Sequence, residues 1–171
     1  MANKEAKTVS RLKDLGKRKV LVNLDKIGAD THIVSVVLDQ DIRNGSIVKL
    51  GEYVERDYYK ATVPSADENI AEDQLVFVAA SILEYDEKIK EEDVVLKAGT
   101  KLRAYLLRRG EIVTITNDGI DGETVVGQFV VPQAGKVEGK ASTTKSAAEL
   151  NLKVIAKEKL SDFDATVLQV L

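Results

Sequence analysis

Short apolar runs separated by turns fill this chain from about residue 20 onward. Runs of about five to eight residues, either alternating with polar residues or continuous, are typical of β-strands. In one run Leu102, Ala104 and Leu106 alternate with Arg103 and Tyr105, which indicates a half-buried strand. We expect strands over 19–24, 31–38, 46–54, 57–63, 74–81, 101–107, 111–116, 125–131, 151–160 and 165–171.

Turn signals divide these runs. Asn44-Gly45 predicts a tight turn, because both residue types tolerate positive φ, and Gly51 favours a β-bulge. Polar or acidic composition predicts loops over 65–73, 117–123 and 133–150, and a loop with one or two helical turns over 84–95. The expected fold is mainly β, a barrel or sandwich of about eight to ten short antiparallel strands with a flexible N-terminal arm.

Length and composition suit one domain with an arm. The chain has 171 residues, of which 44% are hydrophobic and only 5% aromatic, so its core must consist mainly of Val, Leu and Ile. We divide it into a basic arm, 1–19, and a β-rich body, 20–171. The absence of Cys excludes disulfides and thiolate sites and fits a reducing cytoplasm. Neither a secretory signal nor a membrane helix is expected.

Charge is distributed unevenly along the chain. Residues 1–20 hold seven basic and two acidic residues, a balance of +5, whereas the remainder holds 18 basic and 26 acidic residues, a balance of −8. The arm has no aromatic side chain for base stacking, and the acidic body would repel a nucleic-acid duplex. An acidic protein surface is therefore the favoured partner. The candidate contact residues are Lys4, Lys7, Arg11, Lys13, Lys17, Arg18 and Lys19.

Two sequence features could suggest catalysis or nucleotide binding. His32 is the only imidazole, and no nucleophile context accompanies it, so we interpret it as an ordinary packed or surface residue. The segment from Ala134 to Ala141 resembles a phosphate-binding loop. Ala141, however, stands where Ser or Thr must hold Mg²⁺, and the chain does not alternate strands with helices. We expect no catalytic residue and no cofactor.

Two acidic segments could suggest a metal site. Segment 117–123 resembles part of a calcium loop, but Gly119 falls on a ligand position and Gln128 stands where a bidentate Glu is needed. A polar turn is the better interpretation. Asp39 and Asp41 precede a turn and are expected to be solvated. The sequence therefore predicts no metal site.

Several segments resemble the head decoration and minor capsid structural proteins of tailed bacteriophages. These segments are 41–51 (DIRNGSIVKLG), 59–64 (YKATVP), 75–80 (LVFVAA), 85–87 (YDE) and 128–135 (QFVVPQAG). They span roughly residues 39 to 135 in order, and the expected C-terminal hairpin is compatible with the family. The basic arm has no counterpart in the resemblance.

The resemblance implies a non-enzymatic virion protein. Such a protein is made in the host cytoplasm, binds the major capsid protein on the outer surface of the assembled capsid, and stabilises that shell. It can form a homo-oligomer on the capsid lattice, and it contacts neither nucleic acid nor membrane. Two alternatives remain open: another virion component, such as a tail or head–tail connector protein, and a cytoplasmic β-barrel binding module.

Overall fold

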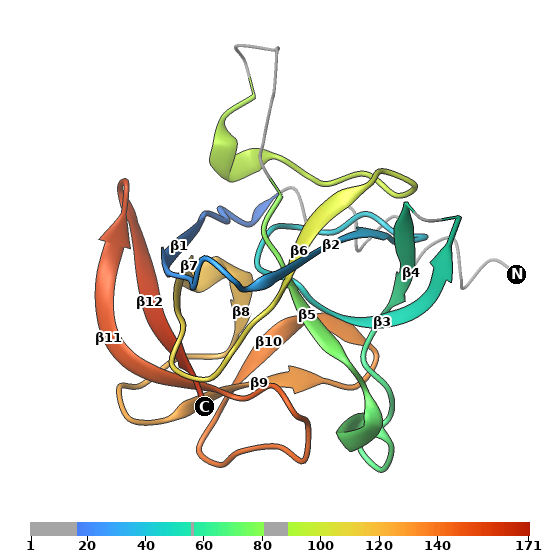
Figure 1. Ribbon diagram of the computed structural model, residues 1–171. Helices are drawn as coiled ribbons and strands as arrows, with labels where there is room; N and C mark the ends of the chain where they lie inside the picture. The colour runs from blue at the N-terminus through green and yellow to red at the C-terminus, as the bar shows by residue number, and fades with distance from the viewer. Residues whose placement is uncertain (1–16, 56, 81–88) are drawn as a thin grey trace, which may run out of the picture.

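The computed structural model describes residues 17–55, 57–80 and 89–171. This part of the chain is mainly β, with two sheets of mostly antiparallel strands (Figure 1). The strands are β1 (Val22–Lys26), β2 (His32–Val37), β3 (Ile47–Val54), β4 (Tyr58–Thr62), β5 (Leu75–Val78), β6 (Leu102–Leu106), β7 (Ile112–Thr116), β8 (Ile120–Asp121), β9 (Phe129–Gln133), β10 (Lys136–Ser142), β11 (Leu152–Leu160) and β12 (Phe163–Val170).

The strands form one barrel and one open sheet. Five strands close the barrel in the order β2-β4-β3-β5-β6, and seven form a sheet in the order β1-β7-β12-β11-β9-β10-β8. Two pairs, β2 with β4 and β8 with β10, are parallel. The described residues include three short 3₁₀ turns, η1 (Ile70–Glu72), η2 (Glu91–Asp93) and η3 (Asn117–Gly119). The expectation of a mainly β barrel or sandwich is confirmed.

Two apolar cores share strands β3 and β5. Val48, Val76 and Val78 point into the barrel, whereas Ile47 and Phe77 point the opposite way, toward the seven-stranded sheet. Because side chains alternate along a strand, a continuous apolar run can serve two cores at once. This arrangement explains why all four residues of β5 are buried.

Most predicted strands lie close to their expected positions, but some segments differ. The first strand covers Val22–Lys26 instead of 19–24, and the loop expected over 117–123 contains the short strand β8. The strand expected over 125–131 begins only at Phe129, and the expected loop over 133–150 contains β10. Charged residues and Gly139 make β10 look like a loop in sequence. Gly139 is needed there because a Cβ atom would lie 2.7 Å from a methyl group of Val130 on β9. The bulge expected at Gly51 is confirmed by a register shift between Leu50 and Tyr53.

Buried Glu111, 7% exposed, ties two turns together ahead of β7. Its carboxylate accepts hydrogen bonds from the backbone N–H of Gly28 (3.0 Å) and of Arg108 (2.7 Å), and from the Thr31 hydroxyl. Burial alone would raise the pKa of Glu111, but these hydrogen bonds outweigh it and lower that pKa below its ordinary value. The folded state therefore favours the ionised form.

Replacing Glu111 by Gln should lower the free energy of unfolding by about 1–3 kcal/mol near neutral pH. A lowered folded-state pKa stabilises the protein above the pKa of the unfolded chain, and this stabilisation is lost as pH falls through the folded value. The difference between wild type and E111Q should therefore shrink in acid. Urea unfolding at about pH 7 and about pH 3 measures it, with exposed Glu68→Gln as the control. An equal deficit at both pH values would contradict the role of the charge.

Candidate interaction site at the root of the N-terminal segment

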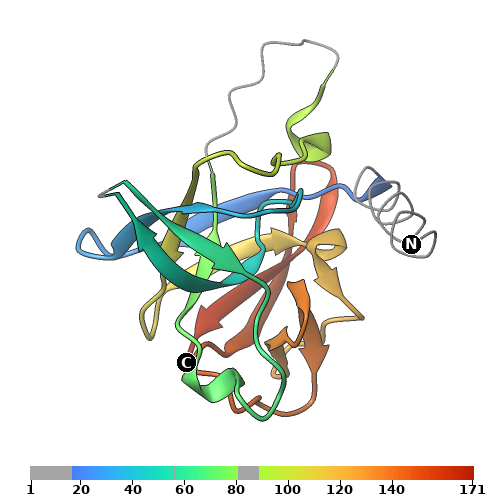
Figure 2. The ribbon, with the colours of Figure 1, turned by 90° about the vertical axis from the view of Figure 1, so that its right-hand side faces the viewer.

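The described chain begins beside two polar loops of the body. Residues 17–21 lead into β1, and the hydroxyl of Thr116, at the end of β7, donates to the carbonyl of Lys19 (2.8 Å) and accepts from the N–H of Leu21 (3.0 Å). The N–H of Val20 donates to the carbonyl of Glu92 in η2 (3.0 Å). Figure 2 shows this blue segment close to η2, in yellow-green. We call residues 17–21 the root.

Arg43 holds the root and η2 together. Its side chain is only 4% exposed, and its guanidinium donates to the carbonyl of Arg18 (2.7 Å) and to the carbonyl of Glu92. Burial lowers the pKa of Arg43, and the charge of nearby Asp93 opposes this shift. An arginine still keeps its charge, because its ordinary pKa is far above neutrality. The charged side chain of Arg43 therefore links the backbone at Arg18 to the backbone at Glu92, and we call Arg43 the clamp.

Acidic side chains of the body surround the basic residues of the root. The Lys19 ammonium pairs with Asp93, and the N–H of Lys19 donates to the Asp118 carboxylate (2.9 Å). Arg18 pairs with Asp121 at 3.4 Å. Burial would raise the pKa of Asp121, but the hydrogen bond from Gln133 and the charges of Arg18 and Lys136 lower it overall. The root is thus fixed to the body by its own charges.

The structure separates the predicted contact residues into three groups. Arg18 and Lys19 are half-buried and engaged with carboxylates of the same chain, whereas Lys17 is exposed. The remaining four, Lys4, Lys7, Arg11 and Lys13, lie outside the described residues. No sequence signal identified Arg43, because its partners are backbone carbonyls of distant segments.

The motifs weighed in the sequence take ordinary structural roles. His32 is an exposed residue at the start of β2. The segment from Ala134 to Ala141 lies in the hairpin of β9 and β10, with Gly135 at φ +72° in its turn. In the calcium-like segment, the Asp118 and Asp121 carboxylates bind groups of the protein itself.

The other acidic segment considered as a metal site, at Asp39 and Asp41, also does not form a cluster of ligands in the described residues. Asp41 accepts a hydrogen bond from the N–H of Ala98 (2.8 Å) and pairs with Lys97. Within residues 17–55, 57–80 and 89–171, no cluster of three His, Cys, Asp or Glu side chains could hold a metal ion. None of the helices described is both long and apolar enough to cross a membrane.

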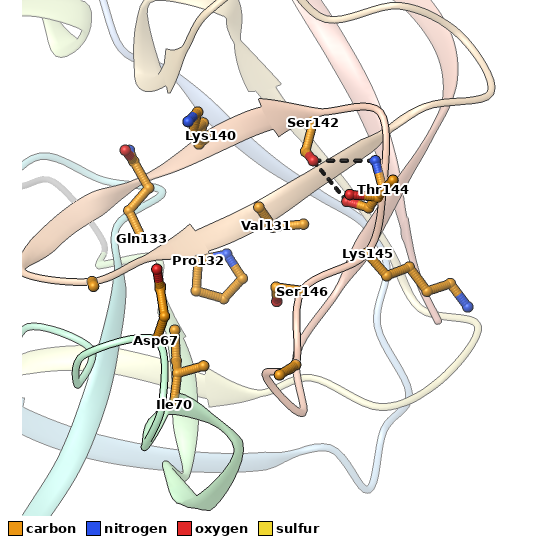
Figure 3. Close-up of a pocket in the computed structure, with 12 residues that line it drawn as sticks. Asp67, Ile70, Val131, Pro132, Gln133, Lys140, Ser142, Thr144, Lys145 and Ser146 are labelled. Carbon is orange, nitrogen blue, oxygen red and sulfur yellow. Dashed lines mark hydrogen bonds between the residues drawn. The ribbon is translucent and has the colours of Figure 1, made fainter.

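A cavity of about 450 Å³ lies between the η1 loop and the hairpin of β9 and β10 (Figure 3). Ile70, Val131 and Pro132 contribute apolar walls, while Lys145 extends away from Pro132. The hydroxyl of Ser142 is occupied within its own loop, where it donates to the carbonyl of Thr144 (2.7 Å). The lining also includes the charged residues Asp67, Lys140 and Lys145. The root, whose hydrogen bonds and ion pairs to the body are defined, is the stronger candidate for an interaction site.

Comparisons with protein-family models, with curated proteins and with solved structures find no match to this chain. Two observations therefore bear on function: the geometry of the root, and the resemblance of sequence segments between residues 39 and 135 to phage head proteins.

Proposed function

We propose that this protein is a head decoration, or cement, protein of a tailed bacteriophage. It binds the outer surface of the assembled capsid through the major capsid protein, stabilises the shell and performs no catalysis. The resemblance of segments between residues 39 and 135 supports this proposal, and so does a body that folds around two apolar cores of its own.

The fixed root is the observation that carries the proposal. Arg43 and the acidic side chains around Arg18 and Lys19 hold the root against the body, and in sequence the root directly follows the basic segment, which we define as residues 1–16. A segment held firmly at one end loses less freedom on binding than one attached through a loose linker. The residues proposed to contact the partner are the five basic residues outside the ion pairs of the root: Lys4, Lys7, Arg11, Lys13 and Lys17.

Weak contacts of this kind become effective on a lattice. An exposed ion pair contributes only about 0–1 kcal/mol and is screened by salt. A capsid presents many identical acidic surfaces, and a protein that contacts several of them at once gains affinity through avidity. Electrostatic attachment by the basic segment therefore suits a repeated protein surface.

Deleting residues 2–16 should leave the melting temperature almost unchanged but strongly reduce attachment to undecorated heads. Lys4, Lys7, Arg11 and Lys13 are lost, while the root contacts of Arg18 and Lys19 remain. Cosedimentation with heads at increasing salt measures the effect, and residual binding should depend less on salt than wild-type binding does. The matched control replaces Arg18 and Lys19 by Gln, which should loosen the root while keeping the four distal charges.

Full occupancy of the truncated protein with unaltered salt dependence would contradict the role of the basic segment. Mass spectrometry of purified virions tests the function itself through the copy number. A decoration protein should be present in on the order of hundreds of copies per particle, as lattice binding requires. About a dozen copies or fewer would favour a tail or connector protein, and absence from virions would favour a cytoplasmic binding module.

A further inference from the structure

Two neighbouring valines project from the loop between β8 and β9. Val125 is 48% exposed and Val126 is 55% exposed. In the described ranges, five large apolar side chains are exposed to this degree, and these two alone are adjacent in sequence. Glu123, also exposed, precedes them by two residues. We call residues 123–127 the valine turn.

The valine turn is held in one conformation. The N–H of Gln128 donates to the carbonyl of Val125 (3.0 Å), and Gly127 supplies the positive φ, +91°, that this turn needs. The N–H of Gly127 also donates to the carbonyl of Val154 on β11 (2.9 Å). Buried Thr124 anchors the other side through its hydroxyl contact with Thr166 (2.7 Å). A fixed turn with stiff β-branched side chains loses little entropy on binding.

A leucine-lined pocket of about 360 Å³ opens elsewhere on the same chain, at the end of β12 near the C-terminus marked in Figure 1. Its apolar lining includes Leu75, Leu107, Leu150 and Val170. The charged side chains in its lining are those of Arg108, Arg109 and Glu149. Arg108 pairs with Asp30, whereas Arg109 makes no ion pair with any residue in the described part of the chain.

We propose that the valine turn of one copy of this chain inserts into the leucine pocket of a second copy. The aliphatic side chains match the apolar lining, and Glu123 complements Arg109 in charge. Turn and pocket are different surfaces, so the contact is heterologous, and the resulting dimer still has one free turn on one copy and one free pocket on the other. This self-association goes beyond the proposed function, because it requires no capsid.

The absence of cysteine allows a direct test by disulfide formation. Val126→Cys and Leu107→Cys variants are purified separately, mixed and oxidised, and the products are separated by mass. The proposal expects the mixed disulfide to exceed both homodimers by about tenfold, because only the mixed pair brings turn and pocket together. Asp162→Cys, at the exposed tip of the β11–β12 hairpin, replaces the valine-turn variant in the control.

A charge exchange separates a specific contact from random collision. Adding Glu123→Arg to the valine-turn variant should lower the mixed yield about tenfold, and adding Arg109→Glu to its partner should restore it. Because Leu107→Cys alters a partly buried residue, a Glu149→Cys variant provides a second partner for Val126→Cys; Glu149 is exposed, lines the same pocket, and its replacement keeps Arg109. Equal yields of mixed and homodimeric products with both partners, or no response to the charge exchange, would overturn the proposal.

Discussion

Replacing Gly45 by Ala should lower the free energy of unfolding by about 3–5 kcal/mol. Gly45 is buried at φ +80°, a conformation that costs a residue with a Cβ atom about 1–2 kcal/mol. The added Cβ would also lie 2.1 Å from Cδ1 of the buried Ile115 side chain on β7, so that side chain must shift within the core. Overpacking of this kind costs about 1–3 kcal/mol more. Urea unfolding followed by circular dichroism measures the loss.

Gly99 supplies the matched control for this substitution. It has nearly the same φ, +78°, but no atom lies within 4 Å of the position of its Cβ. Gly99→Ala should therefore show the conformational cost alone, about 1–2 kcal/mol. Ile115→Val removes the Cδ1 atom, so Gly45→Ala should cost less in that background than in wild type. Equal losses for Gly45→Ala and Gly99→Ala would contradict the steric explanation.

The individual strands could be predicted because their signals are local. The alternation over 101–107 and the apolar run over 74–81 each identify a strand, here β6 and β5. Strand β10 escaped prediction because it is polar and contains Gly139, whose reason for being glycine is a methyl group on the neighbouring strand. Local pattern predicts a barrel or sandwich but cannot show which distant strands pair. Neither the division into a five-stranded barrel and a seven-stranded sheet nor the sharing of β3 and β5 between two cores could therefore be predicted.

The candidate site was predicted only in part, for a related reason. From the charge of the sequence, Arg18 and Lys19 were predicted to contact a partner protein. In the structure Arg18 pairs with Asp121, 103 residues away, and Lys19 pairs with Asp93, 74 residues away. The contacts of Arg43 were not predictable, because its hydrogen bonds go to backbone carbonyls that every residue carries. An arginine beside a turn has no local feature that distinguishes a buried clamp from a solvated side chain.

Replacing Arg43 by Ala should lower the free energy of unfolding by about 3–4 kcal/mol and release the root. The substitution removes the guanidinium donor of the Arg18 carbonyl and one of the two donors of the Glu92 carbonyl. An unsatisfied buried polar group costs about 1–3 kcal/mol, and truncating a buried arginine also removes the packing of its aliphatic stem. The N–H of Val20, which donates to the same Glu92 carbonyl, should then exchange with solvent faster than in wild type. Urea unfolding and amide hydrogen exchange measure the two effects.

Two further variants separate the clamp from the general loss of a positive charge. Arg103→Ala removes an exposed arginine on β6 and should change stability by no more than about 0.5 kcal/mol. Arg43→Lys keeps the charge, but a single ammonium cannot present two donors in the fixed geometry of a guanidinium, so an intermediate loss is expected. If Arg43→Ala loses no more stability than Arg103→Ala, and exchange at Val20 is unchanged, then the root does not depend on the clamp. In that case the fixed position of the root would no longer be an argument for the proposed binding to the capsid.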